Sequence, residues 1–257
     1  MDRLLAAGCI AADEEAAIYL AGAPDEATLE GWLRRRERGE PPAWITERVR
    51  FCGRLLHIAP GLYVPRPQTE ELARRAAALL PGHGRALDLC TGCGAVAAHL
   101  RASVPTAAVI GVDVDRRAVA CARRNGVVAV AADVAEPLPA DGRFDVVTAV
   151  APYVPTEDLD LLPADVQRYE PRIALDGGAD GLDLVRRVIG AARRLLAPGG
   201  WLLVEVGGDQ DQRLGPALAT GFGRAIVWHD DDGDLRGLAA QRSASRGADH
   251  RRQGALE

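Results

Sequence analysis

The sequence contains no lysine, and its only methionine is Met1. All 31 positively charged side chains other than histidine are therefore arginines, a bias that reflects the coding sequence more than a binding surface. The 36 acidic residues outnumber the arginines, and the formal net charge is -5. A general polyanion-binding surface does not follow from this balance, so direct binding of nucleic acid is not expected.

Long apolar runs are absent as well. No run reaches the roughly 18 residues that a membrane-spanning helix needs, so no membrane partner is expected. Cysteine is scarce and odd in number: Cys9, Cys52, Cys90, Cys93 and Cys121. A chain of 257 residues, 48% of them hydrophobic, is large enough to bury a core without disulfides, and we expect a reducing, cytoplasmic location.

The N-terminal part has helical periodicity. Apolar residues recur at helical spacing between Asp13 and Glu40, with a break at "AGAPD", where Asp25 can cap a second helix. We predict a small helical domain over residues 1–50. The following "VRFCGRLLHIAPGLYVPRP" has Gly53 between two short apolar stretches, which predicts a hairpin-like linker over residues 51–68.

Residues 69–240 alternate between apolar strand-like runs and helical stretches rich in Arg and Ala. The runs are "RALDL", "AAVIGVDV", "VVAVAAD", "FDVVTAV", "WLLVEVG" and "RAIVWHD". This alternation predicts an α/β fold, a Rossmann-like doubly wound sheet that is largely parallel. The Asp-rich turn in "DDDGDLRGLAA" can add one antiparallel strand, and residues 241–257 are predicted to be a disordered tail.

The loop after the first predicted strand carries a ligand-binding pattern. From Asp88 to Gly94 the chain reads "DLCTGCG", close to the acid-x-G-x-G-x-G of S-adenosylmethionine sites, with Cys90 in place of the first glycine. Glycines let backbone N–H groups and the next helix N-terminus approach a ligand. Asp113 ends the second strand, where its carboxylate can accept hydrogen bonds from both ribose hydroxyls, and Asp133 ends the third, within reach of the adenine amino group.

Cys90 and Cys93 also form a C-x-x-C, the spacing of redox dithiols and zinc knuckles. A redox pair normally starts a helix without glycines on both sides of its second Cys, and no second Cys/His pair lies nearby to complete a zinc site. The five histidines are scattered through unrelated contexts. We therefore interpret the two cysteines as small side chains in a tight turn, and we expect no metal.

Longer motifs point to one family. "LRRRERGEPPAWI", "YVPRPQTEEL", "FDVVTAVAPYVP", "EPRIALDGGADGLDLVRRVI" and "LAPGGWLLVEVGGDQ" occur in the order found in the N5-glutamine methyltransferases of peptide chain release factors. The chain resembles that family over about residues 29 to 212. The resemblance implies an N-terminal helical domain, here shortened, a hairpin linker and a seven-stranded class I methyltransferase domain.

The resemblance also implies a donor and an acceptor. The donor is S-adenosyl-L-methionine, and the acceptor is the side-chain amide of a glutamine in an exposed protein loop, with a release factor as the candidate partner. The expected donor-binding residues are Asp88, Cys90, Thr91, Gly92, Cys93, Gly94, Asp113, Asp133, Val134 and Val150.

The acceptor motif departs from the family. Where the family has Asn-Pro-Pro-Tyr, this chain has Val150, Ala151, Pro152 and Tyr153, which we expect to position the acceptor. An amide nitrogen is a poor nucleophile that must be held by hydrogen-bond acceptors, and the Asn oxygen would be one of them. Val150 offers none, and an unpaired buried N–H costs about 1–3 kcal/mol. The sequence offers no obvious substitute for that acceptor, and three polar residues stay open as replacements: Thr148, Thr156 and Gln210.

Two other functions remain open from the sequence. The enzyme can methylate another nucleophile, such as a small metabolite, or the chain can be a catalytically silent protein that binds the donor. Arg66, Thr69 and Glu70 in "PRPQTE" can close over the donor or acceptor, although we favour Thr69 as a helix cap. In "DGGADGLD", Asp180 can likewise cap the helix that starts near Leu182.

Overall fold

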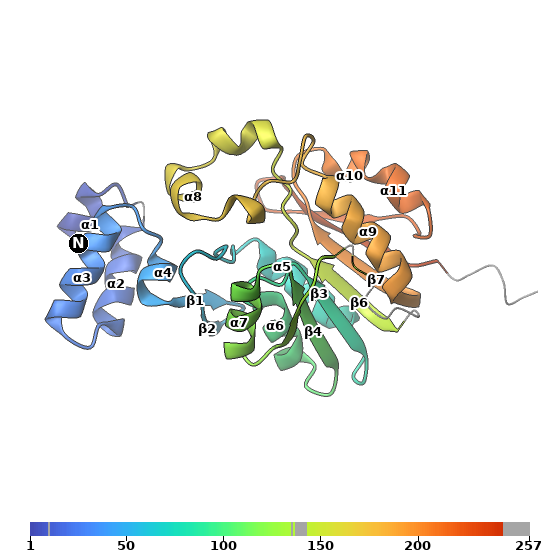
Figure 1. Ribbon diagram of the computed structural model, residues 1–257, viewed down its shortest axis with the longest axis horizontal. Helices are drawn as coiled ribbons and strands as arrows, with labels where there is room; N and C mark the ends of the chain where they lie inside the picture. The colour runs from blue at the N-terminus through green and yellow to red at the C-terminus, as the bar shows by residue number, and fades with distance from the viewer. Residues whose placement is uncertain (10, 135, 137–142, 244–257) are drawn as a thin grey trace, which may run out of the picture.

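The computed structural model describes residues 1–9, 11–134, 136 and 143–243. A helical domain lies at one end of the molecule, a hairpin follows it, and a sheet covered by helices forms the larger part (Figure 1). The first four helices are α1 (Asp2–Ala6), α2 (Ala12–Gly22), α3 (Glu26–Glu37) and α4 (Pro42–Thr46). Tyr19 is fully buried in a small core of their own, separate from the core around the sheet.

Local sequence explains these helix boundaries. Asp25 caps α3, because its side chain accepts a hydrogen bond from the backbone N–H of Thr28 at 2.7 Å, as predicted. Pro42 occupies the first position of α4, where its missing N–H costs nothing. The sequence patterns indicated α2 and α3 but not the two five-residue helices, which are too short to show periodicity.

A hairpin joins the helical domain to the larger domain. Strands β1 (Arg48–Phe51) and β2 (Arg54–His57) pair antiparallel, and Gly53 turns between them with φ +73°. β1 thus begins within the span assigned to the helical domain. The backbone N–H of His57 donates to Asn125 Oδ1 at 2.8 Å, while Asn125 Nδ2 donates to the carbonyls of His57 and Cys93, both at 2.8 Å.

A seven-stranded sheet forms the larger domain, as expected. Its strands are β3 (Arg85–Leu89), β4 (Ala108–Asp113), β5 (Val128–Ala131), β6 (Phe144–Ala149), β7 (Leu196–Glu205), β8 (Ile226–His229) and β9 (Leu235–Gln241), in the order β5-β4-β3-β6-β7-β9-β8. The pairs from β5 to β7 are parallel, and β9 is antiparallel to both of its neighbours. The Asp-rich turn before Leu235 therefore adds the antiparallel strand that the sequence indicated.

Helices cover both faces of this sheet (Figure 1). One core cluster joins α5 (Thr69–Leu79), α6 (Ala95–Ser103) and α7 (Arg116–Arg124) to one face, and the other joins α9 (Asp183–Leu195) and α11 (Gly215–Ala219) to the opposite face. Side chains alternate between the clusters along each strand: in β6, Val146 packs in the first and Val147 in the second. The short helix α10 (Gln210–Arg213) follows β7.

The predicted tail starts too early. Gln241 belongs to β9, where its side-chain Nε2 donates to the carbonyl of Gly199 at 2.8 Å, and Arg242 makes a further bridge to Phe222. The rest of the predicted tail, 244–257, lies outside the described residues.

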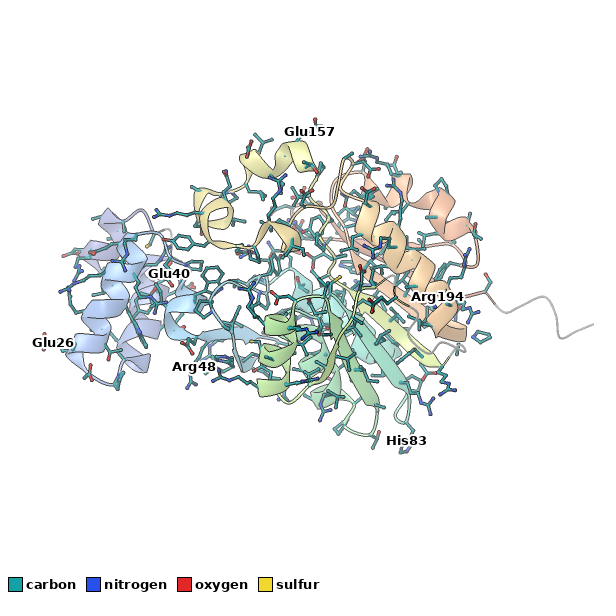
Figure 2. The ribbon with its side chains drawn as sticks, in the orientation of Figure 1. Glu26, Glu40, Arg48, His83, Glu157 and Arg194 are labelled. Atoms are coloured by element: carbon teal, nitrogen blue, oxygen red, sulfur yellow. The ribbon has the colours of Figure 1, made fainter. Side chains whose placement is uncertain are left out.

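An insertion between β6 and α9 was not predicted. It contains η1 (Thr156–Leu161), α8 (Ala164–Tyr169) and η2 (Arg172–Ala174), and it stands beside the carboxyl ends of the parallel strands (Figure 1). We call residues 156–175 the insertion segment. Glu157 at its tip points outward, as does Glu26 on the helical domain (Figure 2). Across the described ranges, the helices are all too short or too polar to cross a membrane.

Candidate active site

A cavity of 770 Å³ opens at the carboxyl ends of the parallel strands. Its size is typical of sites for nucleotide-sized ligands. The predicted site residues line it, with the single exception of Gly94. The fold thus brings the loops after β3, β4, β5 and β6 to one place, as expected for ligand sites of open α/β sheets.

The glycine loop has the backbone conformation that its pattern predicts. Cys90 and Gly92 both have φ +54°, in the left-handed region, so Cys90 does replace the first glycine of the motif. A Cβ built on Gly92 would meet no atom within 4 Å, because this residue faces the open cavity. A ligand can therefore approach the backbone here.

Gly94 lies against neighbouring side chains and does not line the cavity. It precedes α6 with φ +83°, and a Cβ there would lie 3.0 Å from Ala122 Cβ and 3.0 Å from Val127 Cγ2. The glycine is required by the close packing of the loop against α7 and the residues that follow it. The predicted contact between Gly94 and the donor stays a prediction.

Asp113 connects two loops of the cavity. Its Oδ2 accepts a hydrogen bond from the backbone N–H of Gly92 at 2.8 Å, and its Oδ1 accepts one from Asp115 at 2.9 Å. Burial raises the pKa of Asp113. A carboxylate has about four acceptor positions, so two remain for a ligand's hydroxyl groups.

Asp88 lies below the same loop, with only 2% of its surface exposed. Thr91 donates to its Oδ2 at 2.6 Å and Thr148, on β6, donates to its Oδ1 at 2.7 Å. Burial raises the pKa of Asp88 to about 6, although both hydroxyl donors oppose that change.

Asp133 and Val134 lie after β5 and line the cavity. The carboxylate of Asp133 accepts a hydrogen bond from the guanidinium of Arg187 on α9, and the side chains of both are about half exposed. The predicted contact between Asp133 and an adenine amino group therefore has to coexist with this ion pair, and it stays a prediction.

The thiols of Cys90 and Cys93 lie in surroundings typical of small side chains that fill space in a core. Cys93 is 1% exposed within the core that includes α5, α6 and α7, and burial raises its pKa to about 12. Burial also raises the pKa of the Cys90 thiol. Both are free, as are the other three cysteines. In the parts of the chain that the structure describes, no three His, Cys, Asp or Glu side chains are grouped as metal ligands.

The segment from Val150 to Tyr153 follows β6 and forms another wall of the cavity. A second glycine-rich segment fixes its backbone. A Cβ on Gly177 would lie 2.8 Å from the carbonyl oxygen of Pro152, and one on Gly181 would lie 2.4 Å from that of Tyr153. These glycines are needed for close backbone approach to the acceptor motif, so the segment does more than cap a helix.

The capping prediction for Asp180 is only partly right. Its Oδ1 accepts a hydrogen bond from the backbone N–H of Leu182 at 3.1 Å, but Leu182 occupies the N-cap position of α9, where no side chain caps the helix. Asp180 also pairs with Arg186 at 2.5 Å and with Arg213 at 3.4 Å. Its carboxylate thus holds the end of the glycine segment against two helices.

The three candidate replacements for the missing Asn are wrong for this structure. Each of these side chains donates a hydrogen bond to another residue: Thr148 donates to Asp88, Thr156 donates to Asp176 at 2.6 Å, and Gln210 Nε2 donates to the carbonyl of Tyr153 at 2.8 Å. None of the three lines the cavity.

The sequence reasoning missed Glu205, at the end of β7. Its side chain is buried and lines the cavity, and its Oε2 accepts a hydrogen bond from Thr69 Oγ1 at 2.6 Å. The hydroxyl of Tyr153 donates to its Oε1 at 3.1 Å. The capping role given to Thr69 is wrong, because Gln68 precedes α5 and the Thr69 hydroxyl binds Glu205. An acidic residue near the end of the apolar run "WLLVEV" was the sequence signal that could have identified Glu205.

Arg66 in the linker was recognised, but its partner was not. Its Nη2 donates to Glu170 Oε1 at 2.5 Å, and its guanidinium lies 4.9 Å from the centre of the Tyr63 ring. Glu170 belongs to the insertion segment, so this ion pair joins the linker to that segment beside the cavity. Cation–π contact further restricts the orientation of Arg66.

Comparisons with known proteins agree with this geometry. The methyltransferase domain family matches residues 63–236. A release factor glutamine methyltransferase of Geobacter sulfurreducens is 38% identical over 218 residues, covering 82% of this chain and 76% of that protein. A 4-amino-L-phenylalanine/4-methylamino-L-phenylalanine methyltransferase of Streptomyces pristinaespiralis is 37% identical over 235 residues, 86% of this chain and 80% of that protein.

Solved structures share the fold. A 16S rRNA methyltransferase of T. thermophilus, determined with AdoMet and guanosine, has a TM-score of 0.52 at 22% identity. The match covers 77% of this chain and 44% of that one, so this chain spans less than half of its length. With the glycine loop, the cavity and relatives at this identity, the chain belongs to the release factor glutamine methyltransferase family and is an S-adenosylmethionine-dependent methyltransferase.

Proposed function

We propose that this enzyme transfers the methyl group of S-adenosylmethionine to the side-chain amide nitrogen of a glutamine in an exposed protein loop. A peptide chain release factor is the first acceptor to test, given the names of the relatives. The observation that carries the proposal is the backbone of residues 150–153, held at the cavity wall by Gly177 and Gly181.

The donor would be held by the loops after β3, β4 and β5. We assign the backbone around Gly92 and the carboxylate of Asp113 to its polar groups, and Val134 to an apolar face. The residues fit such a group, because Gly92 opens the loop toward the cavity and Asp113 keeps free acceptor positions. When bound, the donor supplies an electrophilic methyl group on a sulfonium sulfur.

The acceptor would lie between the glycine loop and Tyr153. The backbone carbonyl of Ala151 can accept one N–H of the acceptor, and the Tyr153 ring can form an aromatic wall. Orienting a weak nucleophile toward the methyl carbon is the main task of such a site. Val150 contributes only apolar surface where the family has Asn.

A second acceptor class is favoured by one specific observation. The side chain at position 150 is apolar, and Thr148, Thr156 and Gln210 do not replace the missing amide oxygen. An amine on a small molecule would not require that oxygen, and the Streptomyces relative is named for amino-acid substrates of this kind. We therefore keep transfer to a small-molecule amine as the alternative.

Transfer of label from S-adenosylmethionine distinguishes a glutamine acceptor from a small-molecule amine. Wild type and Val150→Asn are incubated with a release-factor-type protein that carries a Gly-Gly-Gln loop, and separately with the small-molecule fraction of a cell extract. For a glutamine acceptor, label enters the protein, and the variant preserves or raises that transfer. Label only in small molecules, with reduced transfer by the variant, supports the amine. The loss would be about ten- to hundredfold, since an unpaired polar group costs about 1–3 kcal/mol.

We also propose a cytoplasmic location. All five cysteines are free, as is usual for proteins of a reducing compartment. Fractionation of cells that express the protein, with a periplasmic marker as the control, tests this.

A further inference from the structure

Val150 and Glu205 lie side by side at the ends of two neighbouring parallel strands. In the register of β6 and β7, Ala149 is paired with Val204, so the next residues of both strands face the same side of the sheet. That side is the one covered by α5, and both residues line the cavity. Glu205 is therefore the acidic group next to the position where the family has its amide-orienting Asn.

The carboxylate of Glu205 has acceptor capacity left for a ligand. Its side chain is 4% exposed and accepts two hydrogen bonds, one on each oxygen, from Thr69 and Tyr153. A carboxylate offers about four acceptor positions. The two bonds fix the orientation of the group, and the remaining positions are available at the cavity.

We propose that Glu205 accepts the N–H of the acceptor nitrogen in place of the missing Asn and takes the proton that this nitrogen loses. The proposal rests on the methyl transfer proposed above. The nitrogen lone pair forms the new N–C bond as the S–C bond breaks, the electron pair of that bond stays on sulfur, and the N–H proton passes to the Glu205 carboxylate. Charge and atoms balance without a further reactant.

The surroundings of Glu205 suit a proton acceptor. Burial raises its pKa above that of an ordinary glutamate, while Thr69, Tyr153 and the cations Arg236 on β9 and Arg66 in the linker oppose this rise. Tyr63 in the linker and Tyr153 face it with neutral phenols, since burial raises the pKa of both. A base works best when its pKa approaches the working pH.

Binding measurements test this without any acceptor. Sinefungin carries an ammonium group where S-adenosylmethionine carries its methyl, whereas S-adenosylhomocysteine carries nothing there. If Glu205 faces the transfer position, wild type prefers sinefungin, and Glu205→Gln loses about ten- to hundredfold in sinefungin affinity while binding S-adenosylhomocysteine equally well. An equal preference in wild type and Glu205→Gln overturns the proposal.

A second measurement needs no change at Glu205. In wild type, the preference for sinefungin falls as the pH is lowered through the pKa of Glu205, because the protonated carboxyl no longer attracts the ammonium. Thr69→Val removes a hydrogen bond that stabilises the charged form, so the midpoint moves to higher pH. Thr156→Val, which removes a hydroxyl that donates to Asp176 outside the cavity, is the matched control and leaves the midpoint in place within about 0.3 pH. A midpoint unmoved by Thr69→Val contradicts the assignment.

Activity gives a third, separable result. With whichever acceptor takes up label, Glu205→Gln lowers kcat by about 10²- to 10⁴-fold and abolishes the rise of rate with pH that we expect of wild type. A variant that keeps this pH-dependent rise overturns the proton-accepting role. Failure of wild type to bind S-adenosylhomocysteine would instead refute the proposed function, since that binding does not depend on Glu205.

Discussion

Gly181 lies so close to Tyr153 that a Cβ on the glycine would be 2.4 Å from the tyrosine's carbonyl oxygen. The same Cβ would lie 2.9 Å from Gln210 Nε2, which donates to that carbonyl. With φ +75°, Gly181 also occupies a backbone region that other residues adopt at a cost. The position of the acceptor motif thus depends on a residue almost 30 positions later in the chain.

We predict that Gly181→Ala lowers the free energy of unfolding by at least about 2 kcal/mol, from the overlap and the positive φ together. Chemical denaturation measures this. Gly190→Ala is the matched control, because a Cβ on this helical glycine meets nothing within 4 Å. It should be neutral or stabilising by up to about 1 kcal/mol. Equal effects of the two substitutions would contradict the close approach.

Asp113→Ala should weaken binding of S-adenosylhomocysteine by more than about a hundredfold. The variant loses the carboxylate that holds the N–H groups of Gly92 and Asp115, and with it the expected contacts to the ribose. Isothermal titration calorimetry gives the affinity. Asp25→Ala also removes a carboxylate that accepts a backbone N–H, in α3, and should leave the affinity unchanged while costing about 1 kcal/mol of stability.

Asp88→Asn should change stability in a pH-dependent way. The folded-state pKa of about 6 exceeds the ordinary 3.8, so the contribution of Asp88 is most favourable below pH 3.8 and is lost as the pH rises through 6. This difference corresponds to about 3 kcal/mol. Relative to wild type, the variant should therefore gain stability between pH 4 and pH 7. Urea titrations of both proteins across this range measure the difference, which a constant offset would refute.

The cysteines of the loop should be dispensable. Cys90→Gly relieves a positive φ, and Cys93→Ala keeps a small apolar side chain in the core, so the double variant should bind S-adenosylhomocysteine within about threefold of wild type. With their pKa values raised, both thiols should react slowly with iodoacetamide at neutral pH in the folded protein. Zinc in the purified wild type that is lost from the double variant would restore the metal interpretation.

Much of the sheet could be predicted because its signals are local. Each of the six apolar runs overlaps a strand, and the glycine pattern predicted the loop conformation, including the positive φ at Cys90 in the place of the first glycine. Asp113 was found for the same reason, as the last residue of a strand. Parallel sheets collect strand ends at one edge, so local recognition sufficed to place these residues at one cavity.

Glu205 shows where this reasoning fails, and Gly94 shows what a local motif leaves undetermined. The register between β6 and β7 decides that Glu205 stands beside Val150, and no local pattern carries a register between strands 50 residues apart. Gly94 was predicted to contact the donor because it belongs to the glycine motif. The motif alone does not reveal whether a ligand or a neighbouring helix lies against a glycine. Here the neighbours are Ala122 and Val127, whose proximity depends on how the helices pack.

The side-chain amide of Asn125 pairs with the backbone of His57 in the way that a neighbouring strand would. It accepts from the N–H of His57 and donates to the carbonyl of the same residue, as a paired backbone would, and the same Nδ2 also reaches the carbonyl of Cys93. One side chain thereby links the hairpin to the glycine loop by hydrogen bonds. The hairpin, and with it the N-terminal helices, is thus fixed to the loop where the donor is proposed to bind. A protein bound to those helices would therefore be held at a fixed distance from the methyl group.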